Sequence, residues 1–360
     1  MKFDLDEDRA LLKSSTRELL EKESPLADAR SVMESSAEGF SKPLYAQLAE
    51  LGYLGLALSE EEGGSGMGAI GLAAVLHEMG RVALPGPYVD LVLAAEALRG
   101  LPVPEAKQAL RALVAGEQRI VLARAESVCG IEAATPATRW QGGRVRGTKL
   151  FVPFGASADA LLVSAAEGLV LVPRPSAGWN AQPLQTLDHA QRFVEVALDA
   201  PGALVAEASP AAQRIEAVDR LGALGAAALL LGLMERALEI SVGYLMERKA
   251  FGVPIGSFQA LQHRAADCLL RVESTRSAVY RAAWALEHDP EAARLLVPVA
   301  KAYAGDSGRI VTGEAIQFFG GVGYTWEYDP HIFFKRTKTL EQFYGSTRAQ
   351  LESALQAAGI

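Results

Sequence analysis

The sequence has little cysteine, no excess of basic residues and no long uninterrupted apolar run. Its 360 residues include two cysteines, Cys129 and Cys268, without metal-ligand spacing, so we expect neither a disulfide framework nor a zinc site. The net charge of −8 argues against nucleic acid as a partner. Because no apolar stretch of about 18 residues is present, no membrane span is expected. The N-terminal segment lacks a basic region followed by an apolar run, so we expect no secretory signal and a cytoplasmic protein.

Three regions differ in their hydrophobic pattern. Residues 1–116 carry apolar residues at helical spacing, interrupted by a glycine-rich loop at 60–66. Residues 117–208 carry short β-branched runs between glycines and prolines, a pattern typical of a small antiparallel β domain, either a barrel or a sandwich. Helical periodicity returns over 209–360 and predicts a four-helix bundle. The sequence therefore predicts an α+β protein in the order helical, β, helical.

Two segments of the last region suggest a ligand. Residues 247–259 read ERKAFGVPIGSFQ, and Arg248 ends a predicted helix just before a turn. Its guanidinium suits a pyrophosphate, because it donates bidentate, charge-assisted hydrogen bonds, although a lone arginine there more often interacts with the helix end or water. Residues 317–324 read QFFGGVGY. These glycines allow backbone to approach an anionic ligand, although an isolated glycine turn more often only ends a helix.

Together, Arg-x-x-Phe-Gly-x-Pro-Ile-x-x-Phe-Gln and Gln-x-x-Gly-Gly-x-Gly-Tyr resemble the helical C-terminal domain of the acyl-CoA dehydrogenase family. The resemblance covers essentially the whole chain, including FDLDE at residues 3–7 and the glycine loop, while WEY at 326–328 resembles the actinobacterial-type members. It implies an FAD bound at a subunit interface and contacted by residues of the neighbouring subunit. The residues that match these contacts are Arg248, Phe251, Gln259, Gln317, Gly320 and Gly321.

Three segments depart from the family pattern. Members normally carry a Thr-Glu-Pro-x-Ala-Gly-Ser-Asp loop that lines the flavin, whereas residues 124–130 read RAESVCG. A Lys-x-Trp-Ile-Thr element against the isoalloxazine is matched only in part by KLFVP at 149–153. The family reads Tyr-Glu-Gly-Thr around its catalytic glutamate, whereas residues 344–347 read YGST. An ungapped count from Arg336 places Gly345 at the position of that glutamate, and glycine cannot remove a proton.

An alternative base lies earlier in the chain. Some members carry the base on an early helix of the C-terminal domain, and the corresponding count leads to Gly222. Asp219 lies one helical turn before it and can share its face. The more ordinary interpretation of Asp219 is a surface aspartate paired with Arg220 or Arg214. Glu341 precedes the usual base position by four residues, but its neighbours place it on the solvated side of a helix.

The family reaction is the α,β-desaturation of an acyl-CoA thioester. A carboxylate removes the α proton, and FAD accepts a hydride from the β carbon. The resemblance implies an acyl-CoA substrate, FAD, a tetrameric dimer of dimers and an electron-transferring flavoprotein as electron acceptor, in lipid or steroid metabolism. Three alternatives follow for this chain. In the first, the chain is a subunit of a hetero-oligomer and has no base of its own, a division of labour known in members that act on steroid side chains. In the second, it forms a homotetramer with a relocated base such as Asp219. In the third, it is a non-catalytic scaffold that binds flavin or an acyl group.

Overall fold

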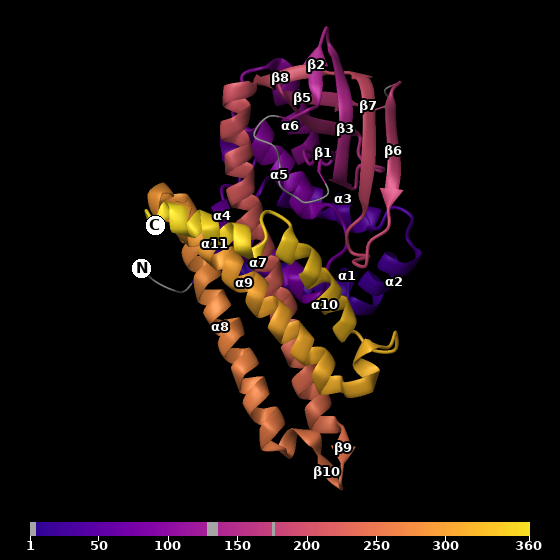
Figure 1. The fold of residues 1–360 in the computed structure, drawn as a ribbon, viewed down its shortest axis with the longest axis vertical. Helices are drawn as coiled ribbons and strands as arrows, with labels where there is room; N and C mark the ends of the chain where they lie inside the picture. The colour runs from indigo at the N-terminus through magenta and orange to yellow at the C-terminus, as the bar shows by residue number, and fades with distance from the viewer. Residues whose placement is uncertain (1–4, 128–135, 175–176) are drawn as a thin grey trace. The chain divides into compact units, whose positions relative to one another are not determined.

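The structure is a computed structural model that describes residues 5–127, 136–174 and 177–360 (Figure 1). The chain divides into two compact units. The first comprises Met1–Ala29, Ala69–Leu84 and Ala223–Ile360, and the second comprises Arg30–Gly68 and Pro85–Gly222. One boundary between them falls inside α7 (Ala208–Glu247), directly after Gly222.

The first unit is helical apart from one short hairpin. It contains α1 (Glu7–Glu23), α4 (Gly68–Arg81), most of α7, β9 (Lys249–Ala250), β10 (Val253–Pro254), η3 (Ile255–Ser257), α8 (Gln259–His288), α9 (Pro290–Phe319), η4 (Gly320–Tyr324), α10 (Pro330–Gln342) and α11 (Thr347–Ala357). Helices α8 and α9 pack along each other, and α10 and α11 pack on α9. The core that α7, α8 and α9 share includes Leu231, Met234, Leu238, Leu245, Cys268, Val272, Val311 and Phe318.

Helix α7 forms part of the protein core. By length and composition it resembles a membrane span, with a mean hydropathy of 1.6 in an 18-residue window. However, 83% of that window is buried inside the protein. An apolar helix whose surface is covered by other helices is typical of the core of a large protein. The burial therefore explains the apolar composition of α7 without a membrane.

The second unit contains two four-stranded sheets. Their strand orders are β1-β4-β5-β8 and β2-β3-β7-β6. The strands are β1 (Ile120–Ala123), β2 (Arg139–Gln141), β3 (Arg144–Pro153), β4 (Ala160–Ala165), β5 (Gly168–Pro173), β6 (Trp179–Leu184), β7 (Phe193–Pro201) and β8 (Ala203–Glu207). The helices of this unit are α3 (Lys42–Glu50), η1 (Tyr53–Gly55), η2 (Glu60–Glu62), α5 (Tyr88–Leu98) and α6 (Pro104–Val114). Helix α2 (Leu26–Ser35) crosses the boundary between the two units. All of β1 is buried, because α5 packs against it. In β3, exposed Arg144 and Arg146 flank buried Val145, so the second sheet has a solvated face.

One strand pair departs from the expected antiparallel arrangement. Strand β1 pairs with β4 in parallel, with Ile120 opposite Ala160. The chain leaves β1 and forms β2 and β3 of the other sheet before it enters β4. This long crossover allows β4 to start from the same end as β1, which a tight hairpin does not. The other pairings of the two sheets are antiparallel.

The order of the elements confirms the predicted α+β architecture, with a helical N-terminal region, a middle β domain and a helical C-terminal domain. Helix α6 ends at Val114, β1 begins at Ile120, and α7 begins directly after β8 at Ala208. The division into residues 1–116, 117–208 and 209–360 stays a prediction.

Candidate functional site

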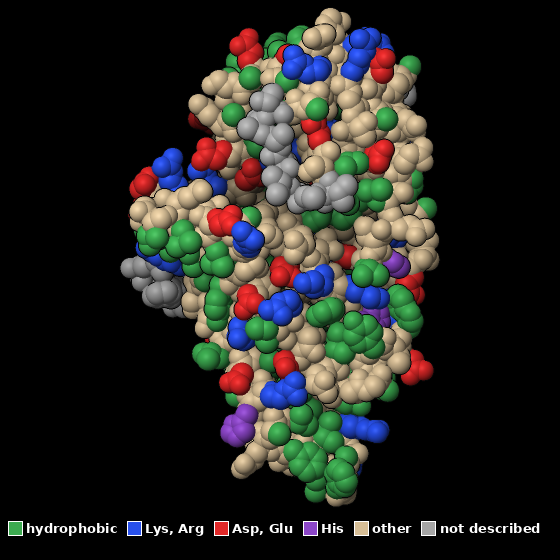
Figure 2. Space-filling view, viewed as in Figure 1, with side chains coloured by type: hydrophobic (Ala, Val, Ile, Leu, Met, Phe, Trp, Pro, Cys, Tyr) green, Lys and Arg blue, Asp and Glu red, His purple; other side chains and the backbone are tan. Residues whose placement is uncertain are grey.

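Arg248 follows the last residue of α7, at the base of the β9–β10 hairpin. At the tip of the hairpin, Phe251 and Gly252 have φ values of +54° and +83°. A non-glycine residue in the left-handed region costs ~1–3 kcal/mol. The Phe251 side chain is 96% exposed, and Figure 2 shows hydrophobic side chains gathered at the end of the molecule that carries this hairpin. Phe251 therefore presents its ring to solvent from a backbone conformation that is unfavourable for a phenylalanine.

The guanidinium of Arg248 is exposed, and within the described residues it makes no hydrogen bond or ion pair. Its backbone, in contrast, is fixed. The N–H of Arg248 donates to the Tyr244 carbonyl at 2.8 Å, and its carbonyl accepts from the Ile255 N–H at 2.8 Å. By comparison, Arg264 on α8 pairs with Glu314 at 2.6 Å. A free guanidinium on a fixed backbone suits an anionic ligand.

The glycine segment after α9 has an open surface. Gly320 has a φ of +64°, and a Cβ added at Gly320 or Gly321 would meet no atom within 4 Å. Gln317 is exposed on the last turn of α9, and Gln259 is exposed as the first residue of α8. Backbone and amide groups of this segment are therefore accessible to a ligand that approaches closely.

Three aromatic rings join the two motifs. Tyr244 stacks on Phe319 with ring centroids 4.2 Å apart and an interplanar angle of 14°. Tyr328 meets both rings edge-on, at 6.0 Å and 5.4 Å. Tyr244 lies one helical turn before Arg248, and Phe319 directly precedes Gly320. This cluster was not predicted from the sequence, in which its only signal is an aromatic residue close to each motif.

The turn around Gly345 connects α10 to α11. Tyr344 and Gly345 have φ values of +58° and +91°. The Gln350 side-chain amide donates to the Tyr344 carbonyl, and Lys301 Nζ donates to the carbonyls of Gly345 at 3.0 Å and Glu341 at 3.1 Å. A Cβ added at Gly345 would lie 2.5 Å from Gln350 Nε2. The conformation therefore disfavours any side chain at position 345.

The prediction that Glu341 lies on the solvated side of its helix is wrong. Glu341 is only 8% exposed, because α10 packs on α9. The carboxylate pairs with Lys338 Nζ at 2.5 Å. Glu341 is thus a buried, paired carboxylate close to the turn.

Asp219 lies on α7 with a side chain that is 47% exposed. Its carboxylate accepts from both terminal nitrogens of Arg124, at 2.5 Å and 3.2 Å. Neither expected partner is correct, since Arg220 pairs with Glu216 at 2.8 Å and Asp219 pairs with Arg124. The carboxylate is therefore engaged in a bidentate ion pair with Arg124. Asp219 as a relocated base stays a prediction.

The counterpart of the flavin-lining loop begins with a buried ion pair, and residues 128–130, including Cys129, lie outside the described part. Lys149 Nζ is completely buried and lies 2.6 Å from Glu126 Oε1. It also donates to the Arg124 carbonyl and to Ser164 Oγ, each at 3.1 Å. Burial alone would raise the pKa of Glu126, but hydrogen bonds from Lys149 and Thr138 lower the pKa to about 2. The pair therefore anchors the end of β1 to β3.

Known proteins resemble this chain along almost its whole length. Residues 6–117 match the family description "Acyl-CoA dehydrogenase, N-terminal domain", and residues 220–358 match "Acyl-CoA dehydrogenase, C-terminal domain". The chain is 31% identical over 352 residues to the acyl-CoA dehydrogenase IpdE2 of Mycolicibacterium smegmatis, covering 96% of this chain and 97% of that protein.

Two solved structures have the same fold. The ChsE4-ChsE5 complex from Mycobacterium tuberculosis aligns with a TM-score of 0.88 at 27% identity, covering 100% of this chain and 99% of that chain. A variant of the Tcur3481-Tcur3483 steroid ACAD aligns with a TM-score of 0.86 at 29% identity, covering 98% of each chain. With both family motifs on the surface of one helical unit, and with similarity along its full length, the chain belongs to the acyl-CoA dehydrogenase family.

Proposed function

We propose that this acyl-CoA dehydrogenase acts as one subunit of a hetero-oligomer. In it, Arg248, Gln259 and Gln317 contact an FAD whose isoalloxazine ring lies against a different subunit. The observation that carries the proposal is the exposed guanidinium of Arg248, which has no partner among the described residues. The similar ChsE4-ChsE5 structure is itself a complex, which supports an assembly of this kind.

The residues of the two motifs fit a dinucleotide with a pyrophosphate. A guanidinium binds phosphate oxygens through charge-assisted hydrogen bonds, and Arg248 has this group free at the base of an exposed hairpin. The open backbone at Gly320 and Gly321 allows close approach, and the amide of Gln317 adds donors and acceptors. Phe251, exposed at the hairpin tip, supplies an apolar contact across the interface. When bound, FAD supplies the hydride acceptor.

Position 345 explains why a second subunit is needed. The α proton of a thioester needs a carboxylate within reach, and general base catalysis typically contributes ~10²–10⁴-fold to the rate. In the ungapped register, Gly345 stands at the base position, in a turn whose conformation disfavours any side chain. Asp219 is paired with Arg124 and Glu341 with Lys338. A different subunit would then supply the base, and an electron-transferring flavoprotein would accept the electrons, as is usual for the family.

A visible absorption spectrum tests the proposal. The chain is purified alone and again after co-expression with a second acyl-CoA dehydrogenase chain of the same organism, and acyl-CoA is added to each. We expect a colourless, inactive protein alone and a yellow complex that acyl-CoA bleaches. A yellow chain that oxidises acyl-CoA by itself would contradict the hetero-oligomer and support the homotetramer. A yellow chain or complex that no acyl-CoA bleaches would support the scaffold.

A further inference from the structure

Helix α1 is attached to the first unit mainly through charged side chains. Only Thr16 and Leu20 of its 17 residues are buried, so the apolar contribution to its packing is small. Three cations of α1 instead reach acidic groups of α4 and α8, and the pairs are Arg9–Glu287 at 3.1 Å, Lys13–Glu78 at 3.6 Å and Arg17–Glu78 at 2.8 Å. A helix held in this way opens at a lower free energy than a helix of the core.

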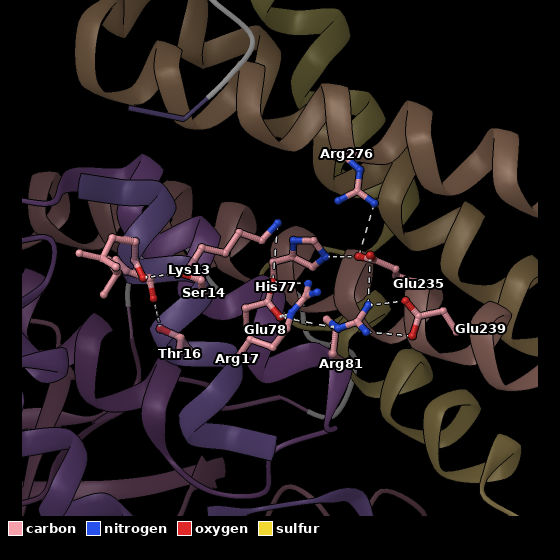
Figure 3. A network of polar contacts seen from close by, with 12 residues as sticks. Lys13, Ser14, Thr16, Arg17, His77, Glu78, Arg81, Glu235, Glu239 and Arg276 are labelled. Carbon is pink, nitrogen blue, oxygen red and sulfur yellow. Dashed lines mark hydrogen bonds and ion pairs between the residues drawn. The ribbon is translucent and has the colours of Figure 1, made fainter. Parts of the chain in front are cut away.

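Lys13 makes the longest of these three ion pairs and lies beside a buried histidine. Its Nζ is too far from Glu78 for a hydrogen bond, and Figure 3 shows its side chain extending toward the His77 ring. His77 is completely buried, its Nε2 bonds with Glu235, and its Nδ1 has no partner among the described residues. Burial lowers the pKa of His77, Glu235 opposes this shift, and the charge of Lys13 adds to it. At neutral pH the folded protein therefore holds an uncharged His77 next to an ammonium group.

We propose that α1 is a pH-sensitive latch, which protonation of His77 releases from α4 and α8. A proton on His77 places a second positive charge beside Lys13, and like charges in a partly buried site repel each other. Release of α1 separates the two charges and gives His77 access to water, so acid favours the released helix. The latch belongs to the first unit and is independent of the proposed function.

The carboxylates around His77 are already engaged with arginines. Glu235 pairs with Arg81 at 3.1 Å and with Arg276 at 3.4 Å, and Glu78 pairs with Arg17 at 2.8 Å. A new positive charge on His77 therefore meets carboxylates whose charge is shared with other cations. The charged and titratable groups of this network are Lys13 and Arg17 on α1, Glu78 and Arg81 on α4, Glu235 and Glu239 on α7, and Glu273, Arg276 and Tyr280 on α8.

Native-state hydrogen exchange of the full-length protein tests the latch. Protection factors of amides in α1 and α9 are measured at about pH 7.5 and about pH 5.5, with and without low concentrations of urea. In wild type we expect α1 to be less protected than α9 and nearly insensitive to urea, because local release exposes little surface. Protection in α1 should fall about tenfold between these pH values, the limit for one histidine whose pKa in the released state is the ordinary value of about 6.5.

Three variants assign the effect to the pair. His77→Gln should abolish the pH dependence in α1, because glutamine donates to Glu235 but does not titrate. Lys13→Met removes the neighbouring charge and should reduce the tenfold fall to about half or less. Lys22→Met is the matched control on the same helix, since Lys22 is exposed and pairs with Glu23, and it should keep the wild-type fall.

Equal protection and equal urea dependence in α1 and α9 would overturn the proposal, because α1 would then leave only when the whole protein unfolds. Local opening of α1 with the same protection at both pH values would also overturn it, as would a pH dependence that survives in His77→Gln. If His77→Gln does not fold, Lys13→Met decides, and the full wild-type fall in that variant would contradict the latch.

Discussion

At Gly345 the backbone has a φ of +91°, and the amide of Gln350 occupies the space that a Cβ would need. Two separate effects oppose a side chain here. The backbone conformation is unfavourable for any L residue, at ~1–3 kcal/mol, and the contact adds repulsion until Gln350 moves. The turn therefore favours glycine at position 345.

We expect Gly345→Glu to destabilise the protein by about 1–3 kcal/mol in urea unfolding. The double variant Gly345→Glu/Gln350→Ala should regain the part of the unfolding free energy that the contact with Gln350 removes. The part that the positive φ removes should stay lost. Gly142→Glu is the matched control, because Gly142 has a positive φ of +58° and open space around it. A Gly345→Glu protein as stable as wild type would contradict this account of the turn.

Arg248→Ala should weaken flavin retention by the hetero-oligomer. A charge-assisted bond contributes ~1.5–3 kcal/mol, which corresponds to roughly 10- to 150-fold in affinity. Flavin absorbance per protein after dilution and gel filtration measures the effect. Arg294→Ala removes another exposed arginine, one paired with Glu291 at 3.7 Å, and should leave flavin occupancy unchanged. Equal occupancy in both variants would remove Arg248 from the FAD site.

Helices α4 and α7 cross at a pair of glycines. A Cβ on Gly80 would lie 2.2 Å from the Leu229 carbonyl, and one on Gly232 would lie 2.0 Å from the His77 carbonyl. Both obstacles are backbone atoms, which cannot rotate away as a side chain can. The helices thus approach each other at a distance that only glycine permits.

Gly232→Ala should therefore cost about 1–3 kcal/mol or more through overpacking. Gly243 lies on the same helix with nothing within 4 Å of an added Cβ. Gly243→Ala should stabilise the protein by roughly 0.5–1 kcal/mol, because alanine has the higher helix propensity. Thermal unfolding of both variants measures the contrast. Equal effects of the two substitutions would show that the crossing is not tightly packed.

A network of charged residues, some buried and some partly exposed, joins α1, α4, α7 and α8 (Figure 3). Glu78, only 1% exposed, accepts from Arg17 at 2.8 Å and 3.0 Å. His77 is completely buried and its Nε2 bonds with Glu235. The other members are Lys13, Arg81, Glu239 and Arg276. Nearly every charge in the network faces one of opposite sign, which is the condition for burying such groups.

Stability should fall as the pH drops below about 6.5, the ordinary pKa of histidine. Burial lowers the pKa of His77, although its bond to Glu235 opposes the shift. The unfolded chain therefore binds a proton on His77 at a pH where the folded protein does not, and acid favours unfolding. Glu235 acts in the same direction below about pH 4.5, since His77, Arg276 and Arg81 lower its pKa despite burial.

His77→Gln keeps a donor for Glu235 and removes the titration. The variant should show a shallower loss of unfolding free energy between pH 6.5 and 5 than wild type in urea titrations. His288→Gln is the control, because His288 is an exposed histidine near the end of α8. Parallel pH profiles for wild type and His77→Gln would exclude His77 as the source of the acid sensitivity.

For the whole molecule, the proposed assembly predicts that the isolated chain is a poor dehydrogenase. We expect its rate with acyl-CoA to be ~10²–10⁴-fold below that of the hetero-oligomer, because the proposed register puts Gly345, which has no carboxylate, at the base position. Asp219→Asn distinguishes the homotetramer, in which it should abolish the rate of the isolated chain. A fast isolated chain whose rate is unchanged in Asp219→Asn would contradict both the hetero-oligomer and the relocated base.

The family, the order of helical and β regions and the two motifs that resemble the family's FAD contacts follow from the sequence alone. Hydrophobic periodicity is a local property of each element, and each motif spans fewer than fifteen residues.

Only the tertiary structure decided which charged groups are free. Asp219 pairs with Arg124, 95 residues away in the sequence, rather than with a neighbour on its own helix. Glu341 is buried because α10 packs on α9, and β1 pairs in parallel with β4 because other strands intervene. Arg248 remains without a partner among the described residues. Burial and ion pairing depend on contacts between distant segments, which local periodicity does not encode.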